Sequence, residues 1–214
     1  MAKNWIWISG WGTYPDRFRR AVELALPEDS HQILAPTPDA LEKTLDSGAD
    51  CIGGYSLGSL ILLSALRQIP EHANITCLAP FIAFCKEDQL GGKTPKTVLH
   101  KLQQRLQKQP TKTLQLFYRL TELSDPLTDL ADHLPYPIEH LQWGLEQLVT
   151  LKADTDFLSR VKAFAGSIDP LINHREMQSI WSTCHFIDNC NHDYHRLLTA
   201  LSNRLNLKSS LSLP

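Results

Sequence analysis

Residues 50–69 read DCIGGYSLGSLILLSALRQI, and this stretch carries most of the information about the fold. Residues 50–54 are a short, largely apolar segment that ends in two glycines, which predicts a buried β-strand followed by a turn. Leu57–Ile69 is strongly apolar and predicts a buried helix that stops before a proline. The turn between them, Gly54–Gly58, has the pattern G-x-S-x-G. In this context the pattern exposes a serine hydroxyl on a strained turn, so we expect Ser56 to be a nucleophile; the alternative is a chance match in a small-residue turn.

The sequence on either side of this motif alternates between strand-like and helix-like segments. Such alternation predicts an α/β fold, in which helices flank both faces of a mostly parallel central sheet. The predicted strands are residues 5–8, 31–34, 50–54, 75–79, 161–165 and 183–187, and the predicted helices are residues 16–26, 38–45, 57–69, 174–181 and 194–205.

The alternation is interrupted by one long segment of purely helical character. Residues 92–158 have helical spacing that is broken only by prolines. We therefore expect an all-helical lid inserted after the strand that follows the nucleophile helix. The predicted organisation is a single core formed by residues 1–88 and 159–207, a lid at 89–158 and a flexible, serine-rich tail at 208–214.

The composition excludes several classes of protein. A chain of 214 residues is typical of one compact domain, and 43% hydrophobic with 21% charged residues is typical of a soluble globular protein. A net charge of −2 is against general nucleic-acid binding, and no apolar run is long enough for a membrane span. The five cysteines are scattered without a CxxC pair, so we expect no metal site and no disulfide framework. We predict a cytoplasmic monomer that uses no cofactor.

A nucleophilic serine requires a base, and the base requires an acid that orients it. Asp169 lies in the sequence GSIDP directly after a predicted strand, where the ligand-facing loops of an α/β sheet lie. We predict that Asp169 is this acid, although an ordinary turn aspartate before proline is the alternative. Asp154, Asp156 and Asp188 are weaker candidates.

The base is expected to follow the acid in the chain. His192 lies in the sequence NCNHD between the last predicted strand and the last predicted helix, where a loop can bring an imidazole to the serine. His195 is the second candidate because it stands at the start of that helix, while His185 falls within a strand and is expected to be structural. The alternative for the first two is a polar surface histidine.

Hydrolysis through a serine also requires backbone N–H donors for the oxyanion that forms on the substrate. One donor should be the N–H of Leu57, which directly follows the nucleophile. The other should come from an early strand-to-helix loop, which Ser9–Gly12 matches, and we predict the N–H of Trp11. Trp11 could instead be a core aromatic residue.

These residues resemble the α/β-hydrolase superfamily and, within it, the pimeloyl-ACP methyl ester carboxylesterases of biotin synthesis (the BioH family). Gly10-Trp11-Gly12 is similar to that family's H-G-W-G turn, and Gly54–Gly58 to its G-W-S-L-G elbow. Outside the general catalytic motifs, Ala79–Pro95 is similar to the stretch that leads to its Lys-Pro pair. Gly144–Leu148 is similar to the G-L-E-x-L segment that closes its lid.

The resemblance implies the α/β-hydrolase fold and the same site, with Ser56 as nucleophile, Asp169 as acid, His192 as base, and Trp11 and Leu57 as oxyanion donors. It also implies an acyl carrier protein as the partner that carries the substrate. This sequence departs from the family pattern at Ser9 and Ser59, where the family has histidine and glycine, and it is shorter before the nucleophile.

The predicted lid carries an asymmetric charge. Between Leu90 and Thr121 there are seven basic residues and no acidic ones, which leaves −9 on the remainder of a chain with net charge −2. A cationic lid could steer an acidic carrier protein, and the alternative is an ordinary solvated helix face. The acidic residues between Glu122 and Asp132 do not match the basic residues that the BioH family is expected to have there. The basic residues are Lys93, Lys96, Lys101, Arg105, Lys108, Lys112 and Arg119, of which the last five are predicted carrier contacts. Leu99, Leu102, Leu106, Leu114, Phe117 and Tyr118 are predicted to form the inner face of the lid.

Four functions are compatible with these features. The first is hydrolysis of the methyl ester of pimeloyl-ACP, which the resemblance implies. The others are a general small-molecule esterase or thioesterase, a lyase with the same triad, and a non-catalytic binding module with the same fold. The presence of all three triad residues is against the last of these.

Overall fold

The computed structural model describes the backbone of residues 2–122 and 133–211. Six strands form one sheet in the order β2-β1-β3-β4-β5-β6, and every neighbouring pair is parallel. This confirms the predicted fold class. The strands are β1 (Asn4–Ile8), β2 (Ser30–Leu34), β3 (Cys51–Tyr55), β4 (Asn74–Leu78), β5 (Val161–Gly166) and β6 (His185–Ile187).

Helices cover both faces of the sheet, and the four inner strands β1, β3, β4 and β5 are largely buried on both sides. In β1, Trp5 and Trp7 pack with one group of core residues, while Ile6 and Ile8 pack with the other. The first group includes residues of α1 (Pro15–Ala25) and α8 (Tyr194–Leu211). The second group includes residues of α2 (Ala40–Asp46), α3 (Leu57–Ser64) and α7 (His174–Ile180).

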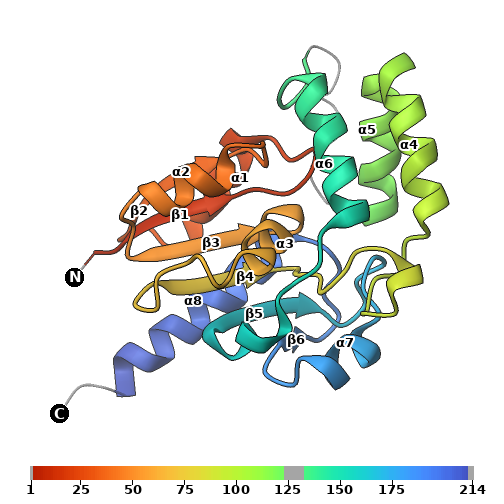
Figure 1. Ribbon diagram of the computed structural model, residues 1–214. Coiled ribbons are helices and arrows are strands. Elements are labelled where there is room, and N and C mark those ends of the chain that lie inside the picture. Colours follow the sequence, from red (N-terminus) through yellow and green to blue (C-terminus); the bar gives the residue numbers. More distant parts are fainter. Residues whose placement is uncertain (1, 123–132, 212–214) are drawn as a thin grey trace.

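In the described part of the insertion between β4 and β5, three α-helices are present. They are α4 (Lys96–Lys108), α5 (Pro110–Thr121) and α6 (Ile138–Thr150), and Figure 1 shows them together beyond one end of the strands. Two short 3₁₀ helices, η1 (Lys86–Asp88) and η3 (Thr155–Arg160), flank the insertion. All six residues predicted for the inner face of the lid are buried and belong to the larger core group. The acidic residues at 125, 129 and 132 lie outside the described residues.

Two helix ends differ from the sequence prediction by five or six residues. The nucleophile helix α3 ends at Ser64, five residues before the expected Ile69, and the chain continues in turns up to Pro70. Arg160 binds the carbonyl oxygens of Leu66, Ile69 and Pro70 at 2.8–3.0 Å, so partners from outside the helix satisfy these groups. At the other end of the chain, α8 runs to Leu211 and includes the first four residues of the expected tail.

All five cysteines are buried and free. Burial raises the pKa of the Cys77 thiol to about 12, as expected for a small core residue. Within residues 2–122 and 133–211, no helix is long and apolar enough to cross a membrane. The same residues contain no group of three or more His, Cys, Asp or Glu side chains that could hold a metal ion.

Candidate active site

Ser56 stands on a strained turn between β3 and α3. Its backbone has φ 54° and ψ −115°, which is an unfavourable conformation for a residue with a side chain. The two motif glycines make this turn possible. A Cβ on Gly58 would lie 2.0 Å from the carbonyl oxygen of Ile8, and a Cβ on Gly54 would lie 2.7 Å from the backbone of Ser59. The G-x-S-x-G pattern is therefore required by close packing of the strand, the turn and the helix.

Ser56, His192 and Asp169 form a continuous hydrogen-bonded chain. The Oγ of Ser56 lies 2.9 Å from Nε2 of His192, and Nδ1 of His192 lies 2.6 Å from Oδ2 of Asp169. The three residues are 5%, 1% and 0% exposed. With Asp169 ionised, Nδ1–H donates to the carboxylate and Nε2 accepts from the serine hydroxyl, which is the arrangement a general base requires.

The loop that holds Asp169 is tied to the segment that leads into the lid. The second carboxylate oxygen, Oδ1, accepts a hydrogen bond of 2.8 Å from the N–H of Leu171. Lys93 donates from its backbone to the carbonyl of Leu171 and from its Nζ to the carbonyl of Asp169, both at 3.0 Å. Sequence reasoning counted Lys93 only as part of the lid charge and missed this contact.

The His192 ring is packed between aromatic residues. The ring of Phe81 stacks on it with centroids 5.8 Å apart, and the ring of Tyr55 lies 5.4 Å away. The hydroxyl of Tyr55 also donates to the carbonyl of His192 at 2.9 Å, and burial raises the pKa of this phenol well above its usual value. Sequence reasoning assigned no role to Phe81 or Tyr55, because packing against a loop 110 or more residues away leaves no local pattern.

The weaker candidates lie elsewhere. Asp154 and Asp156 pair with Arg67 at the surface, and Asp188 is exposed. His195 is exposed in the first turn of α8. The structure therefore joins Ser56 to His192 and Asp169, the two residues that the sequence favoured over these candidates.

The two predicted oxyanion donors lie in buried positions near the elbow. Leu57 is the first residue of α3, and Trp11 lies in a turn closed by the hydrogen bond from Thr13 N–H to the Gly10 carbonyl. Within the described part of the chain, neither the Trp11 nor the Leu57 backbone N–H donates to a protein acceptor. A Cβ on Gly144 would lie 2.6 Å from the Trp11 ring and 3.1 Å from the Leu57 side chain, so all three residues meet at one place.

Comparisons with known proteins identify this arrangement at the level of the fold. No protein-family profile matches the sequence, and no curated protein matches it. Solved structures do match. An esterase from Exiguobacterium antarcticum superposes with a TM-score of 0.69 at 13% identity, over 98% of this chain and 90% of that one.

Two further structures agree. A lipase-esterase related protein from Clostridium acetobutylicum has a TM-score of 0.61 at 13% identity, over 98% of this chain and 94% of that one. The carboxylesterase CesB from Bacillus subtilis has a TM-score of 0.55 at 14% identity, over 98% of this chain and 82% of that one. This chain has the α/β-hydrolase fold. The sequence identities are low, so the likeness shows the fold alone.

The basic residues of the lid divide into two groups on this α/β-hydrolase fold. Lys93 and Lys96 are engaged near the core, Lys93 with the Asp169 loop and Lys96 with Asp88 at 3.5 Å. The other five are exposed on α4 and α5. They are Lys101, Arg105, Lys108, Lys112 and Arg119.

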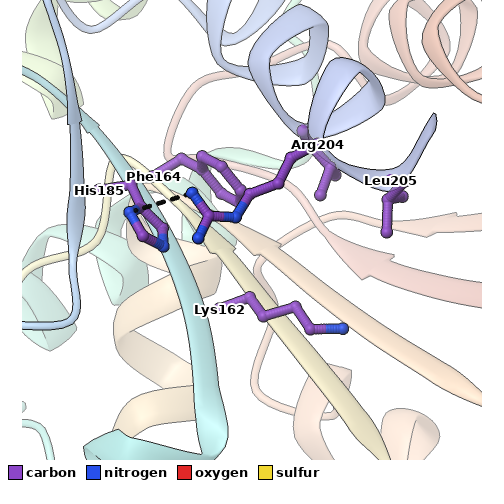
Figure 2. Close-up of a pocket in the computed structure, with 6 residues that line it drawn as sticks. Lys162, Phe164, His185, Arg204 and Leu205 are labelled. Atoms are coloured by element: carbon purple, nitrogen blue, oxygen red, sulfur yellow. Dashed lines mark hydrogen bonds between the residues drawn. The ribbon is translucent and has the colours of Figure 1, made fainter. Parts of the chain in front are cut away.

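A separate cavity of about 90 Å³ lies away from this site. Figure 2 shows Lys162, Phe164, His185, Arg204 and Leu205 around it, with the guanidinium of Arg204 directed at His185. Its strand residues are Lys162 and Phe164 of β5 and His185 of β6, whereas Asp169 and His192 follow the ends of these strands. Ser56, Asp169 and His192 are not among the described residues that line this cavity, so it is separate from the hydrogen-bonded chain of the candidate site.

Proposed function

We propose that the protein is a serine hydrolase that cleaves carboxylic esters. The observation that carries this proposal is the buried chain from Ser56 through His192 to Asp169, with distances of 2.9 and 2.6 Å, on a strained strand-to-helix turn. A binding module needs no such chain. The names of the similar structures, which are esterases and lipases, support the same reaction class.

The geometry supports a two-step reaction. His192 takes the proton of the Ser56 hydroxyl while Oγ attacks the ester carbonyl carbon, and the N–H groups of Trp11 and Leu57 bind the resulting oxyanion. As the carbon–oxygen bond to the alcohol breaks, His192 gives the proton to the leaving alcohol. Water then attacks the acyl-enzyme with His192 again as base, which releases the acid and restores Ser56.

We propose further that the ester is a methyl ester on a dicarboxylic acyl chain attached to an acyl carrier protein, as in pimeloyl-ACP methyl ester. Two features support this narrower function. One is the resemblance of Ala79–Pro95 and Gly144–Leu148 to the methyl ester carboxylesterases. The other is the exposed basic surface of α4 and α5, which could receive an acidic carrier.

The test compares the wild-type protein with Ser56→Ala and, as a matched control, Ser64→Ala on the same helix. We expect the wild type and Ser64→Ala to hydrolyse p-nitrophenyl butyrate and to react with a fluorophosphonate. Ser56→Ala should lose at least about 10³-fold in kcat and all labelling. A wild type that shows neither hydrolysis nor labelling would contradict the hydrolase proposal and favour a binding module.

The substrate is tested with pimeloyl-ACP methyl ester. Turnover of this substrate with release of methanol supports the narrower function. Cleavage that releases the carrier thiol instead indicates a thioesterase. Turnover of only the short ester indicates a general esterase, and labelling of Ser56 without hydrolysis of any ester favours a lyase.

A further inference from the structure

Two tyrosines of the lid bind Gly12, the residue that follows Trp11 in its turn. The N–H of Gly12 donates to the hydroxyl of Tyr136 at 2.6 Å, and the hydroxyl of Tyr118 donates to the carbonyl oxygen of Gly12. Tyr118 lies on α5, and Tyr136 lies two residues before α6. Both polar groups of one residue in a core turn are thus held by side chains from the insertion.

These contacts lie in the interior of the protein. Tyr118 and Tyr136 are each 8% exposed, and burial raises the pKa of Tyr136 above its usual value. Gly12 has a left-handed backbone, with φ +70°, and a Cβ there would lie 2.9 Å from Leu114 of α5. A buried peptide group that loses its partner cannot be rehydrated in place, so the turn depends on both hydroxyls.

The ring of Trp11 is held by the same insertion. Its Nε1–H donates to the carbonyl of Leu141 on α6 at 2.7 Å, and Phe117 of α5 packs edge-on with ring centroids 4.6 Å apart. The lid therefore fixes Trp11 through its side chain and through the peptide that follows it. With both held, the backbone N–H of Trp11 has a defined direction.

We propose that Tyr118 and Tyr136 are positioning residues for hydrolysis, because they hold the Gly12 peptide groups and thereby aim the Trp11 N–H at the substrate oxyanion. This inference rests on the proposed function. An oxyanion donor acts mainly in the transition state, so a misaimed donor lowers kcat more than it changes KM.

The experiment uses Tyr136→Phe, Tyr118→Phe and the double variant, with Tyr14→Phe as the matched control. Tyr14 also binds the lid segment, because its hydroxyl donates to the carbonyl of His133 at 2.7 Å, but this bond does not involve Gly12. Each variant is assayed with p-nitrophenyl butyrate for kcat and KM. An alkyl trifluoromethyl ketone is used as inhibitor, since its adduct with Ser56 carries an oxyanion. Thermal unfolding shows that each variant is folded at the assay temperature.

We expect Tyr136→Phe and Tyr118→Phe each to lower kcat at least tenfold, with KM changed less than threefold. The inhibition constant of the ketone should rise by a similar factor, and Tyr14→Phe should match the wild type. A merely structural role would lower the unfolding temperature but leave kcat and the inhibition constant of the folded protein unchanged, which would overturn the inference. The inference also fails if Tyr14→Phe loses as much activity as the other variants.

The two proposals fail differently. A wild type that neither hydrolyses esters nor reacts with a fluorophosphonate removes the proposed function, and the positioning role falls with it. An active wild type whose Tyr136→Phe and Tyr118→Phe variants retain full kcat removes only the positioning role.

Discussion

His192 is fixed in one orientation by contacts of different kinds. Asp169 holds Nδ1 at 2.6 Å, Phe81 stacks on the ring, and Tyr55 binds the backbone carbonyl at 2.9 Å. The hydrogen bond to Asp169 restricts rotation of the ring, and stacking on Phe81 restricts its tilt. The hydrogen bond from Tyr55 restricts displacement of the loop that carries His192. The imidazole therefore points Nε2 at Ser56 in the absence of substrate, which is the preorganisation that the proposed proton transfer requires.

Replacement of Asp169 by asparagine tests this arrangement at the residue scale. The amide cannot stabilise the charged imidazolium and can hold the ring in the wrong tautomer, so we expect kcat for p-nitrophenyl butyrate to fall about 10³- to 10⁴-fold. The control is Asp156→Asn, because Asp156 is an aspartate that pairs with Arg67 at the exposed surface. Loss of activity below about tenfold in Asp169→Asn, or an equal loss in the control, would contradict the assigned role.

At the scale of elements, the sequence predicts what depends on local pattern and misses what depends on distant partners. The elbow and the parallel alternation are local, because strand, turn and helix residues follow one another. The end of α3 at Ser64 is not local, since the carbonyls beyond it are bound by Arg160, about 90 residues away. The same distinction applies to the candidate site. The order of Ser56, Asp169 and His192 along the chain made them predictable, whereas no local pattern indicates that Lys93 contacts Asp169.

Arg160 is therefore expected to matter for stability. In Arg160→Met the carbonyls of Leu66, Ile69 and Pro70 lose a common donor, and we expect the free energy of unfolding to fall by about 1–3 kcal/mol. Urea unfolding measures it. The matched control is Arg67→Met, whose ion pairs are exposed and should contribute below about 1 kcal/mol. If the control loses as much as Arg160→Met, the carbonyl contacts are not the cause.

At the scale of the whole molecule, the two ends of the insertion are joined to each other. Ala83, after β4, forms an antiparallel bridge with Lys152, after α6. Asp88 then pairs with Lys152 at 2.8 Å and with Lys96, at the start of α4, at 3.5 Å. We call these contacts between Ala83, Asp88, Lys96 and Lys152 the base of the lid. They hold the two ends of the insertion together, in addition to the packing of its apolar inner face.

This base predicts a pH dependence of stability. Burial opposes ionisation of Asp88, but Lys152 and Lys96 outweigh it, so the pKa of the carboxyl lies below its usual value. The stabilisation is therefore present above the unfolded pKa, near 4, and is lost as the pH falls through the lower folded value. We expect Asp88→Asn to lower the unfolding free energy by about 1 kcal/mol at pH 7 and by much less near pH 3. Urea unfolding at both pH values measures the difference, and Asp46→Asn, at an exposed aspartate, should show no such change. A loss that is equal at both pH values would contradict the ionic origin.

Exposed basic residues of the lid form a row of positive charge on α4, and this row is relevant to the proposed carrier protein. On α4, Lys101, Arg105 and Lys108 are exposed at intervals of four and three residues, so they follow one side of the helix, away from the buried leucines of the same helix. A row of positive charge on a protein of net charge −2 can raise the rate at which an acidic partner associates in the correct orientation.

Neutralising this row tests the carrier proposal. The variant combines Lys101→Gln, Arg105→Gln and Lys108→Gln. We expect this triple variant to lower kcat/KM for pimeloyl-ACP methyl ester about tenfold or more at low salt. Its kcat/KM for p-nitrophenyl butyrate should equal that of the wild type. The loss should shrink as salt screens the wild-type charges. A control with the same change in net charge, Arg19→Gln, Arg20→Gln and Lys43→Gln, alters exposed residues of α1 and α2 and should behave as wild type. Equal losses in both triple variants would indicate an effect of net charge alone, and unchanged carrier kinetics would show that the row is an ordinary solvated helix face.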